Sequence, residues 1–141
     1  MSDEYTISSD PDLLDREWIH KVISTDTYWG IGRSRERMDQ AIDHSLVYGL
    51  YDGEGRQLAF ARLITDRTTF AWLSDVFVDR DARGTGLSKR LVAHIVDEAD
   101  GMGVRRVLLA TGDAQGLYQR FGFVEIADDY SWMYKVWPDR P

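Results

Sequence analysis

The sequence contains no cysteine, so disulfide bonds, thiolate metal sites and a cysteine nucleophile are excluded. Prolines occur only at positions 11, 138 and 141, and nothing between them has the composition of an interdomain linker. No apolar stretch approaches the roughly 18 residues of a membrane-spanning helix, and the acidic residues 1–4 are not followed by the apolar run of a signal peptide. We therefore expect a cytoplasmic protein that does not contact a membrane.

Basic residues are also in the minority. The chain carries 17 lysines and arginines against 24 acidic residues, which gives a net charge of −7. Binding to a nucleic-acid backbone requires a basic face, so we expect no nucleic-acid partner. An acidic surface can attract a cationic amine, although many soluble proteins are acidic without such a role. The 141 residues, 43% of them hydrophobic, are enough for one domain with a buried core.

Hydrophobic periodicity divides the first half of the chain into helices and then strands. A short strand is predicted at residues 5–8, and a helix is predicted to begin with Asp10 as its cap and Pro11 at its first position. Ser34 can cap a second helix after a loop at residues 24–32. The pattern then predicts an antiparallel meander with strands at residues 46–51, 57–64 and 70–78 and a hairpin turn at residues 52–55.

The second half of the chain alternates between helix and strand. A helix with one apolar face is predicted after Gly86, and Gly101 and Gly103 are predicted to end it. Asp113 can cap a later, shorter helix that runs to Phe121. This order of elements predicts an α/β domain on a mixed sheet. The remaining strands are predicted at residues 107–110, 123–126 and 130–136.

The strongest functional signal is a glycine-containing turn that joins a strand to a helix. The strand ends at Phe77 and Val78, and the turn continues through Arg83-Gly84-Thr85-Gly86-Leu87-Ser88 into the helix. Backbone N–H groups of such a turn point at one spot, where the helix dipole adds partial positive charge and Arg83 adds a fixed cation. The turn therefore predicts a pyrophosphate site, although a strand-to-helix turn with a glycine hinge has the same pattern.

Two common pyrophosphate motifs do not fit this turn. The P-loop pattern G-x-x-x-x-G-K-[ST] is absent, and the Rossmann pattern G-x-G-x-x-G fails because Lys89 stands where the third glycine is required. The turn instead resembles the cofactor motif Q/R-x-x-G-x-G/A of the GNAT acetyltransferase superfamily, with Arg83, Gly86 and Ser88 at the motif positions. Ser88 replaces the usual glycine or alanine, and because serine is small we expect cofactor binding to be kept.

The resemblance implies that acetyl-CoA binds at this turn and that CoA leaves as a product. In the family the N–H groups of the turn hold the CoA pyrophosphate, and the edge of the preceding strand pairs with the pantetheine arm. Asp113 is included among the cofactor contacts, although many members have asparagine there. The implied cofactor-binding residues are Phe77, Val78, Arg83, Gly84, Thr85, Gly86, Leu87, Ser88 and Asp113.

Residues 113–123 resemble a later motif of the same superfamily, A-x-x-L-Y-x-x-x-G-F. In the family that tyrosine commonly protonates the departing CoA thiolate, so the resemblance implies that Tyr118 is a catalytic acid. A phenol with a pKa near 10 can donate to a thiolate whose conjugate acid has a pKa near 8.5 if the two are in contact. The alternative is that Tyr118 only packs on the sheet. The matching positions are Ala114, Leu117, Tyr118, Gly122 and Phe123.

The resemblance covers roughly Leu46 to Lys135 and implies a fold for the whole chain. That fold is a GNAT-like single α/β domain with a mixed, mostly antiparallel sheet of about six or seven strands, flanked by about four helices. We expect one acetyltransferase domain over residues 1–141. Within it, residues 1–45 would form acceptor-pocket helices and residues 46–136 the cofactor-binding core. The sequence leaves open whether the protein forms a homodimer.

The expected reaction is direct attack of a small-molecule amine on the acetyl thioester, for which the amine must lose a proton. Some members that act on polyamines have adjacent acidic residues where this chain has Ser74 and Asp75. Strand alternation predicts that Asp75 shares a face with Leu73 and Phe77. Asp75 is a candidate base or amine anchor, and the alternative is a structural carboxylate bonded to backbone or arginine. His44 is a second candidate base, although its place at a helix end favours capping.

Three residues before the second predicted helix are candidates for the acceptor pocket. Tyr28, Trp29 and Arg33 form a polar and aromatic cluster that could bind the acceptor or simply pack. Two other functions remain open, namely acetylation of a protein lysine or N-terminus and a non-catalytic acyl-CoA-binding regulatory role. Tyr118 favours an enzyme over a binding module. We therefore predict an acetyl-CoA-dependent N-acetyltransferase that acts on a small-molecule amine and needs no metal.

Overall fold

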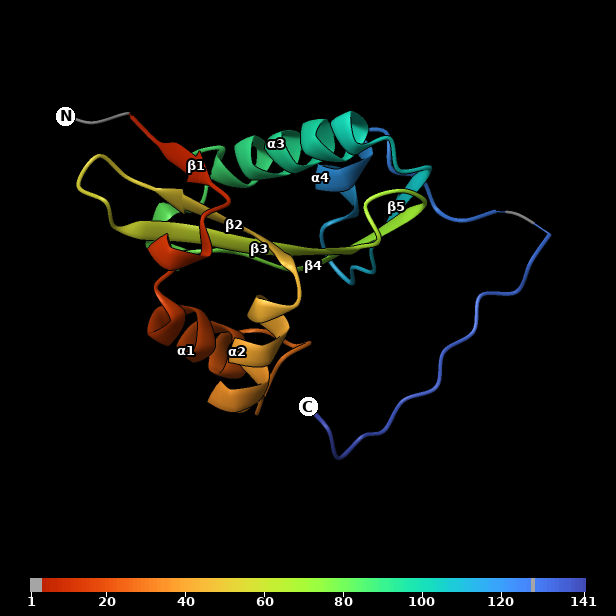
Figure 1. Cartoon of the computed structure of the whole chain (residues 1–141), viewed down its shortest axis with the longest axis horizontal. Coiled ribbons are helices and arrows are strands. Elements are labelled where there is room, and N and C mark those ends of the chain that lie inside the picture. The colour runs from red at the N-terminus through yellow and green to blue at the C-terminus, as the bar shows by residue number, and fades with distance from the viewer. Residues whose placement is uncertain (1–3, 128) are drawn as a thin grey trace.

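The computed structural model describes residues 4–127 and 129–141, in which one sheet separates two layers of helices (Figure 1). Helices α3 and α4 cover one face of the sheet, and α1 and α2 cover the other. The elements are β1 (Thr6–Ser8), η1 (Pro11–Leu13), α1 (Arg16–Asp26), α2 (Arg35–Asp43), β2 (Leu46–Tyr51), β3 (Gln57–Thr65), β4 (Phe70–Val78), η2 (Arg80–Ala82), α3 (Leu87–Met102), β5 (Arg106–Leu108) and α4 (Gln115–Gln119).

The sheet has the order β1-β2-β3-β4-β5, with neighbours adjacent in the chain. The first four strands pair antiparallel, and β5 pairs parallel with β4 after the crossover through α3. The predicted α/β class and the mixed, mostly antiparallel sheet are therefore confirmed. The strand count is corrected, because the described residues form five strands rather than six or seven.

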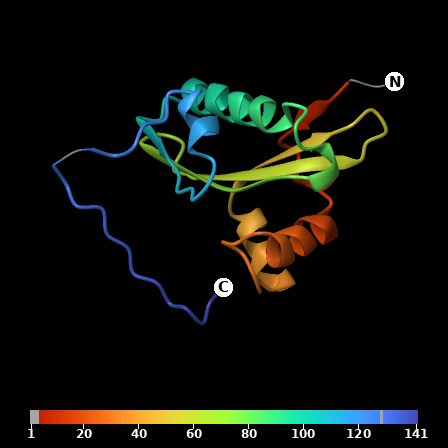
Figure 2. The same ribbon diagram turned by 180° about the vertical axis from the view of Figure 1, so that it is seen from behind.

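The two closing strands predicted at residues 123–126 and 130–136 are not present. Residues 123–127 and 129–141, here called the C-terminal arm, leave the body of the protein after α4 and return toward α2 (Figures 1 and 2). Phe123 is half-buried, and the other residues of the arm are exposed, with Met133 at 90% and Tyr134 at 88%. Alternating apolar residues form a strand only where a neighbouring strand supplies hydrogen bonds and a face to bury, and no described strand pairs with the arm.

The strands supply a separate core to each helix layer because their side chains alternate between the two faces. Leu63 and Leu73 pack with α3, whereas Phe60 and Phe77 pack with α1 and α2. The core on the α1 and α2 side is completed by Ile19, Ile23, Met38, Ile42 and Val47. In the described part of the chain, no helix is long and apolar enough to cross a membrane.

The helix starts follow the predicted caps, with one interruption. Asp10 caps η1 as predicted, but the backbone at Leu14 is extended and the helix restarts with Asp15 as its cap. The Asp15 side chain accepts a hydrogen bond from the Trp18 amide at 3.0 Å, so a second capping residue divides one predicted helix into two. Ser34 caps α2 as predicted, by accepting from the Arg37 amide.

Two other predicted helix boundaries are corrected. Gly101 lies inside α3, which ends at Gly103 in the left-handed conformation. Asp113 does not cap α4, whose cap position is Ala114. The Thr111 hydroxyl instead accepts the amides of Asp113 and Ala114 at 3.3 and 3.0 Å, so threonine orders this loop.

Candidate active site

Strands β4 and β5 separate after three paired residues. The last pair is Trp72 with Leu108, and β4 continues to Val78 without a strand partner on that side. A cleft of about 350 Å³ opens at the fork, between residues 72–76 of β4 and residues 109–114 after β5. An unpaired strand edge beside a cleft can bind an extended ligand through backbone hydrogen bonds.

A second cavity, of about 420 Å³, continues from the fork to the start of α3. Phe77, Val78, Arg83, Gly84, Gly86, Leu87 and Ser88 all line it, as expected of a cofactor site, but Thr85 does not. The Thr85 hydroxyl donates back to the Ala82 carbonyl at 2.6 Å. The two cavities adjoin, because both are lined by Tyr28, Trp29, Val76, Asp113, Ala114 and Tyr118.

The turn before α3 holds two glycines in the left-handed region. Gly84 has a φ of +83° and Gly86 a φ of +84°, which a residue with a Cβ adopts only with strain. A Cβ at either position would meet nothing within 4 Å, so the backbone there faces open space. No side chain caps the first-turn amides of α3, which are therefore available to an anion.

Arg83 is held beside this turn by contacts with the end of β4. Its Nε donates to the Val78 carbonyl at 3.0 Å, and its guanidinium lies 5.0 Å from the centre of the Phe77 ring. These contacts orient the cation along the wall of the second cavity.

Tyr118 stands on α4 where the two cavities meet. Its side chain is buried and packs edge-on against Phe123, with ring centres 5.8 Å apart. Burial raises the pKa of Tyr118 to about 12, and Tyr28 and Asp113 add to the rise. Among the described residues its hydroxyl has no hydrogen-bond partner and is free to donate. A raised pKa favours the protonated form of this hydroxyl.

The loop between α1 and α2 closes the other side of the fork. The Tyr28 hydroxyl accepts the Gly112 amide at 2.7 Å, and the Tyr28 and Trp29 rings meet edge-on at 5.0 Å. The Trp29 indole Nε1 donates to Asp75 Oδ1 at 2.9 Å. The structure thus brings together four of the predicted site residues, namely Tyr28, Trp29, Arg33 and Asp75.

Asp75 lies at an irregularity in β4. Between the pairs Phe60–Phe77 and Arg62–Ser74 the register shifts, so β4 carries one extra residue, and Asp75 has a φ of +56°. The bulge reverses the alternation, and Leu73 and Phe77 pack into opposite cores. The prediction that Asp75 shares one face with both is therefore wrong. Aspartate tolerates this left-handed backbone better than most residues with a Cβ.

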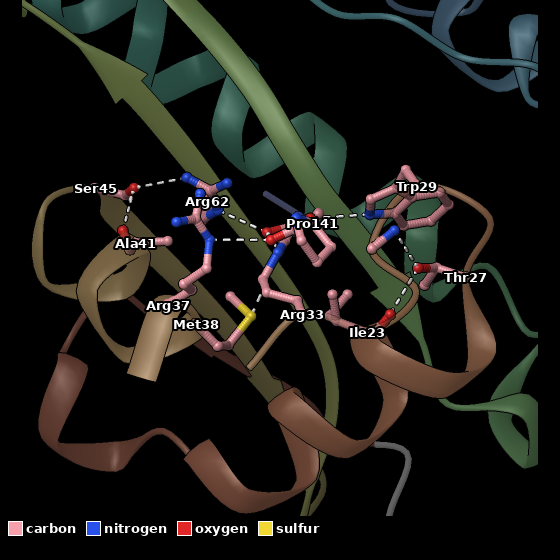
Figure 3. A network of polar contacts seen from close by, with 12 residues as sticks. Ile23, Thr27, Trp29, Arg33, Arg37, Met38, Ala41, Ser45, Arg62 and Pro141 are labelled. Carbon is pink, nitrogen blue, oxygen red and sulfur yellow. Dashed lines mark hydrogen bonds and ion pairs between the residues drawn. The ribbon is translucent and has the colours of Figure 1, made fainter. Parts of the chain in front are cut away.

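The Asp75 carboxylate accepts hydrogen bonds from three neighbouring side chains. Its Oδ2 accepts from Arg33 at 2.7 Å and from Arg62 Nε at 2.6 Å, and its Oδ1 accepts from Trp29 Nε1. Figure 3 labels Trp29, Arg33 and Arg62 and marks their polar contacts with dashed lines. Burial alone would raise the pKa of Asp75, but Arg62 and Arg33 outweigh it and hold the pKa below its ordinary value. A low-pKa carboxylate with all its partners in place is a weak proton acceptor, which favours the structural alternative.

Arg62 is the site residue that the motifs missed. It is the only charge in the apolar run of residues 58–64 on β3, and a charge buried in such a strand needs a partner. That isolated charge was the available signal, and Arg62 also donates to Ser45 at 3.2 Å. His44, the other candidate base, is exposed at the C-terminal cap of α2 and lines neither cavity.

The site holds aromatic, acidic and basic groups but no metal-binding arrangement. Over residues 4–127 and 129–141, no group of three or more His, Asp or Glu side chains is placed to hold a metal ion. The arrangement has three parts that bear on chemistry: a turn whose backbone amides are uncapped, an open strand edge, and the Tyr118 hydroxyl, which has no hydrogen-bond partner among the described residues.

Comparison with known proteins connects this geometry with one family. The sequence profile of the Acetyltransferase (GNAT) family matches residues 12–123. A solved structure from Xanthomonas campestris pv. campestris, assigned to the GNAT acetyltransferases, is 43% identical, with a TM-score of 0.90 over 98% of this chain and 96% of that one.

Two enzymes of Oryza sativa subsp. japonica are also similar. Serotonin N-acetyltransferase 2 is 34% identical over 96 residues, which cover 64% of this chain and 48% of that protein. Glucosamine 6-phosphate N-acetyltransferase 1 is 32% identical over 90 residues, covering 59% and 54%. The matched part thus spans about half the length of each rice enzyme. The family profile matches most of the chain, and the chain therefore belongs to the GNAT family of acetyltransferases.

Proposed function

We propose that this protein transfers an acetyl group from acetyl-CoA to a primary amine of a small molecule. The observation that carries the proposal is the Tyr118 hydroxyl, placed where the anion-binding turn and the fork of β4 and β5 meet. The two rice relatives are named for acetylation of small amines, which supports the same class of acceptor. In this proposal residues 1–45 supply the acceptor side and residues 46–136 the cofactor core.

The residues at the end of β4 fit acetyl-CoA. The first-turn amides of α3 and Arg83 would hold the pyrophosphate, and the open edge of β4 near Phe77 and Val78 would hold the pantetheine arm. When bound, acetyl-CoA supplies an activated acetyl thioester. Asp113 lines both cavities. Because its negative charge would repel a phosphate, we place it beside the cofactor and not in contact with the pyrophosphate.

Two proton movements complete the reaction. The acceptor must lose a proton, and for an alkyl amine with a pKa near 10 this costs roughly 4–5 kcal/mol at neutral pH. Tyr118 donates its hydroxyl hydrogen toward the sulfur as the carbon–sulfur bond breaks. Asp75 acts as a positioning residue that fixes Trp29 and Arg33. Water in the fork would receive the amine proton, and a proton from water would then restore the Tyr118 hydroxyl.

The acetyl-transfer step is tested by incubation with labelled acetyl-CoA and pooled polyamines, arylamines, amino acids and peptides. Label transferred to a small amine supports the proposal. Transfer confined to peptides would replace it with protein acetylation, and cofactor binding without any transfer would favour a regulatory binding module.

Acetyl-CoA is expected to stabilise the folded protein. At about 100 times the dissociation constant the gain is about 2.7 kcal/mol, measured as a rise in melting temperature. Gly86→Val should remove that rise, because a β-branched residue disfavours the left-handed turn and fills the space before the α3 amides.

Gly55→Val is the matched control for this measurement. Gly55 has the same φ of +84° and equally open surroundings, but it lies in the turn between β2 and β3. Its variant should lose a similar amount of stability and keep the full shift with acetyl-CoA. Equal shifts for both variants and the unchanged protein would contradict the cofactor assignment.

The pH dependence of kcat/KM should reflect the acceptor and not Tyr118. Because burial raises the pKa of Tyr118 to about 12, the donor stays protonated throughout the range in which the enzyme is stable. The rate should rise as the amine deprotonates and should show no falling limb near the ordinary tyrosine pKa of about 10. A falling limb there that Tyr118→Phe abolishes would contradict the buried, high-pKa donor.

A homodimer also remains a proposal, and the C-terminal arm is the feature that supports it. Val124, Met133 and Tyr134 are 84–90% exposed, which is uncommon for apolar side chains of a monomer. The match to the Xanthomonas structure covers 98% of this chain and so includes most of the arm. Light scattering during size-exclusion chromatography should give twice the 16.2 kDa chain mass, and a single-chain mass would contradict the dimer.

A further inference from the structure

A third cavity, of about 590 Å³, adjoins the active site and is lined by arginines. It shares Trp29 with the two cavities already described. Arg33, Arg37 and Arg62 line it from the loop before α2, from α2 and from β3, and Arg140 lines it from the C-terminal arm. No aspartate or glutamate is among its described lining residues. This cavity is called the arginine pocket.

The positive charge of the arginine pocket is only partly balanced. Asp75 is the shared carboxylate of Arg33 and Arg62, whose side chains are only 14% and 12% exposed. Arg37 has no aspartate or glutamate partner among the described residues, and its Nε donates to a main-chain oxygen of Pro141 at 3.0 Å (Figure 3). Three guanidinium groups therefore face one aspartate side chain and one main-chain oxygen, in a protein whose net charge is −7.

Guanidinium groups in excess of aspartate and glutamate favour an anionic ligand. Guanidinium presents several donors in a plane and pairs with carboxylate or phosphate oxygens. The Pro141 oxygen on Arg37 shows that an oxygen acceptor fits within reach of this side chain. A cationic polyamine, in contrast, would be repelled here.

The arginine pocket and the fork are connected through Asp75 and Trp29. Asp75 lines the fork, while both of its arginine partners line the pocket. Trp29 lines both cavities and donates to Asp75. An anion held by Arg37 would therefore place the rest of a small molecule along Trp29, next to the fork that contains Tyr118.

Resting on the proposed acetyl transfer, we infer that the acceptor is an amine that also carries a carboxylate or a phosphate, and that Arg37 helps to bind this anion in the arginine pocket. The amine then faces the fork, and binding displaces the Pro141 oxygen from Arg37.

Matched acceptor pairs test the inference. L-phenylalanine is compared with phenethylamine for a carboxylate, and glucosamine 6-phosphate with glucosamine for a phosphate. In at least one pair the anionic member should have the higher kcat/KM, and the pair that shows the preference identifies the anion. Hydrogen bonds to charged groups correspond to about a 10- to 100-fold effect.

Arg37→Gln should remove the preference without unfolding the protein, because Arg37 is exposed and makes no ion pair with an aspartate or glutamate among the described residues. The KM of the amine that carries the anionic group should rise about 10- to 100-fold, while kcat and the kinetics of the amine without that group should change little. Arg35→Gln is the control, since Arg35 is on the same helix but pairs with Asp39 at 3.0 Å and does not line the pocket.

The possible outcomes separate this inference from the proposed function. Acetylation of amines with no preference in either pair, or a preference that survives in Arg37→Gln, overturns the inference and leaves acetyl transfer standing. If none of the amines is acetylated, the proposed function fails. Melting temperatures measured with CoA plus L-phenylalanine or inorganic phosphate then test whether the arginine pocket binds an anion. A rise that Arg37→Gln removes supports the anion site, and no rise overturns it.

Discussion

Tyr118→Phe is expected to lower turnover by about 100- to 10,000-fold while acetyl-CoA affinity hardly changes. The substitution keeps the ring, its burial and its edge contact with Phe123, and it removes only the hydroxyl. That hydroxyl has no protein partner among the described residues, so its loss leaves no donor or acceptor unpaired. The melting temperature should therefore stay close to that of the unchanged protein.

Tyr51→Phe is a matched control for the chemistry. Burial raises the pKa of Tyr51 to about 12 as well, and its hydroxyl is likewise without a partner in the described residues, but it lies on β2 and lines neither active-site cavity. Its variant should keep full turnover. Turnover should be measured in a single cycle, so that slow product release does not hide the effect. Equal turnover of Tyr118→Phe and Tyr51→Phe would make Tyr118 a packing residue.

The glycine turn before α3 was largely predictable from the sequence, because it depends on local backbone conformation. Gly84 and Gly86 can be identified as residues that adopt a left-handed turn, and an apolar helical period follows them. Strand β4 also has its predicted bounds of 70–78. Local sequence therefore determines the positions of the turn and of Tyr118 relative to the strands.

The contacts around Asp75 were not predictable in the same way, because they join residues that are distant in the sequence. Arg33 and Arg62 reach Asp75 across 42 and 13 positions of the chain, and no local motif marks such a set. The bulge at Asp75 also reversed the expected alternation, since a register shift involves two strands. The prediction for the C-terminal arm failed for a related reason: its alternating pattern is that of a strand, but none of the described strands pairs with it.

Asp75→Asn is expected to cost about 3–5 kcal/mol of stability, because it leaves two nearly buried arginines without a counter-charge. For a domain of this size each kcal/mol shifts the melting temperature by roughly 3 °C, so a fall of about 10 °C is expected. Asparagine tolerates the left-handed backbone at this position, so the change tests charge rather than conformation. Asp39→Asn is the control: Asp39 also pairs with two arginines, Arg16 and Arg35, but near the surface, and about 0–1 kcal/mol is expected there.

The pH dependence of this stability difference has a definite sign. Arg62 and Arg33 hold the pKa of Asp75 below its ordinary value of 3.8, so the folded protein binds this proton less readily than the unfolded chain does. The stabilisation is therefore complete above about pH 5 and is lost as the pH falls below 3.8 toward the folded pKa. The melting temperatures of Asp75→Asn and the unchanged protein should converge over that acid range and differ by a constant amount at neutral pH. If Asp75→Asn instead kept its stability, raised the KM of the acceptor and moved the pH–rate profile to higher pH, Asp75 would be the base or amine anchor. A carboxylate with three donors already in place makes the first result the expected one.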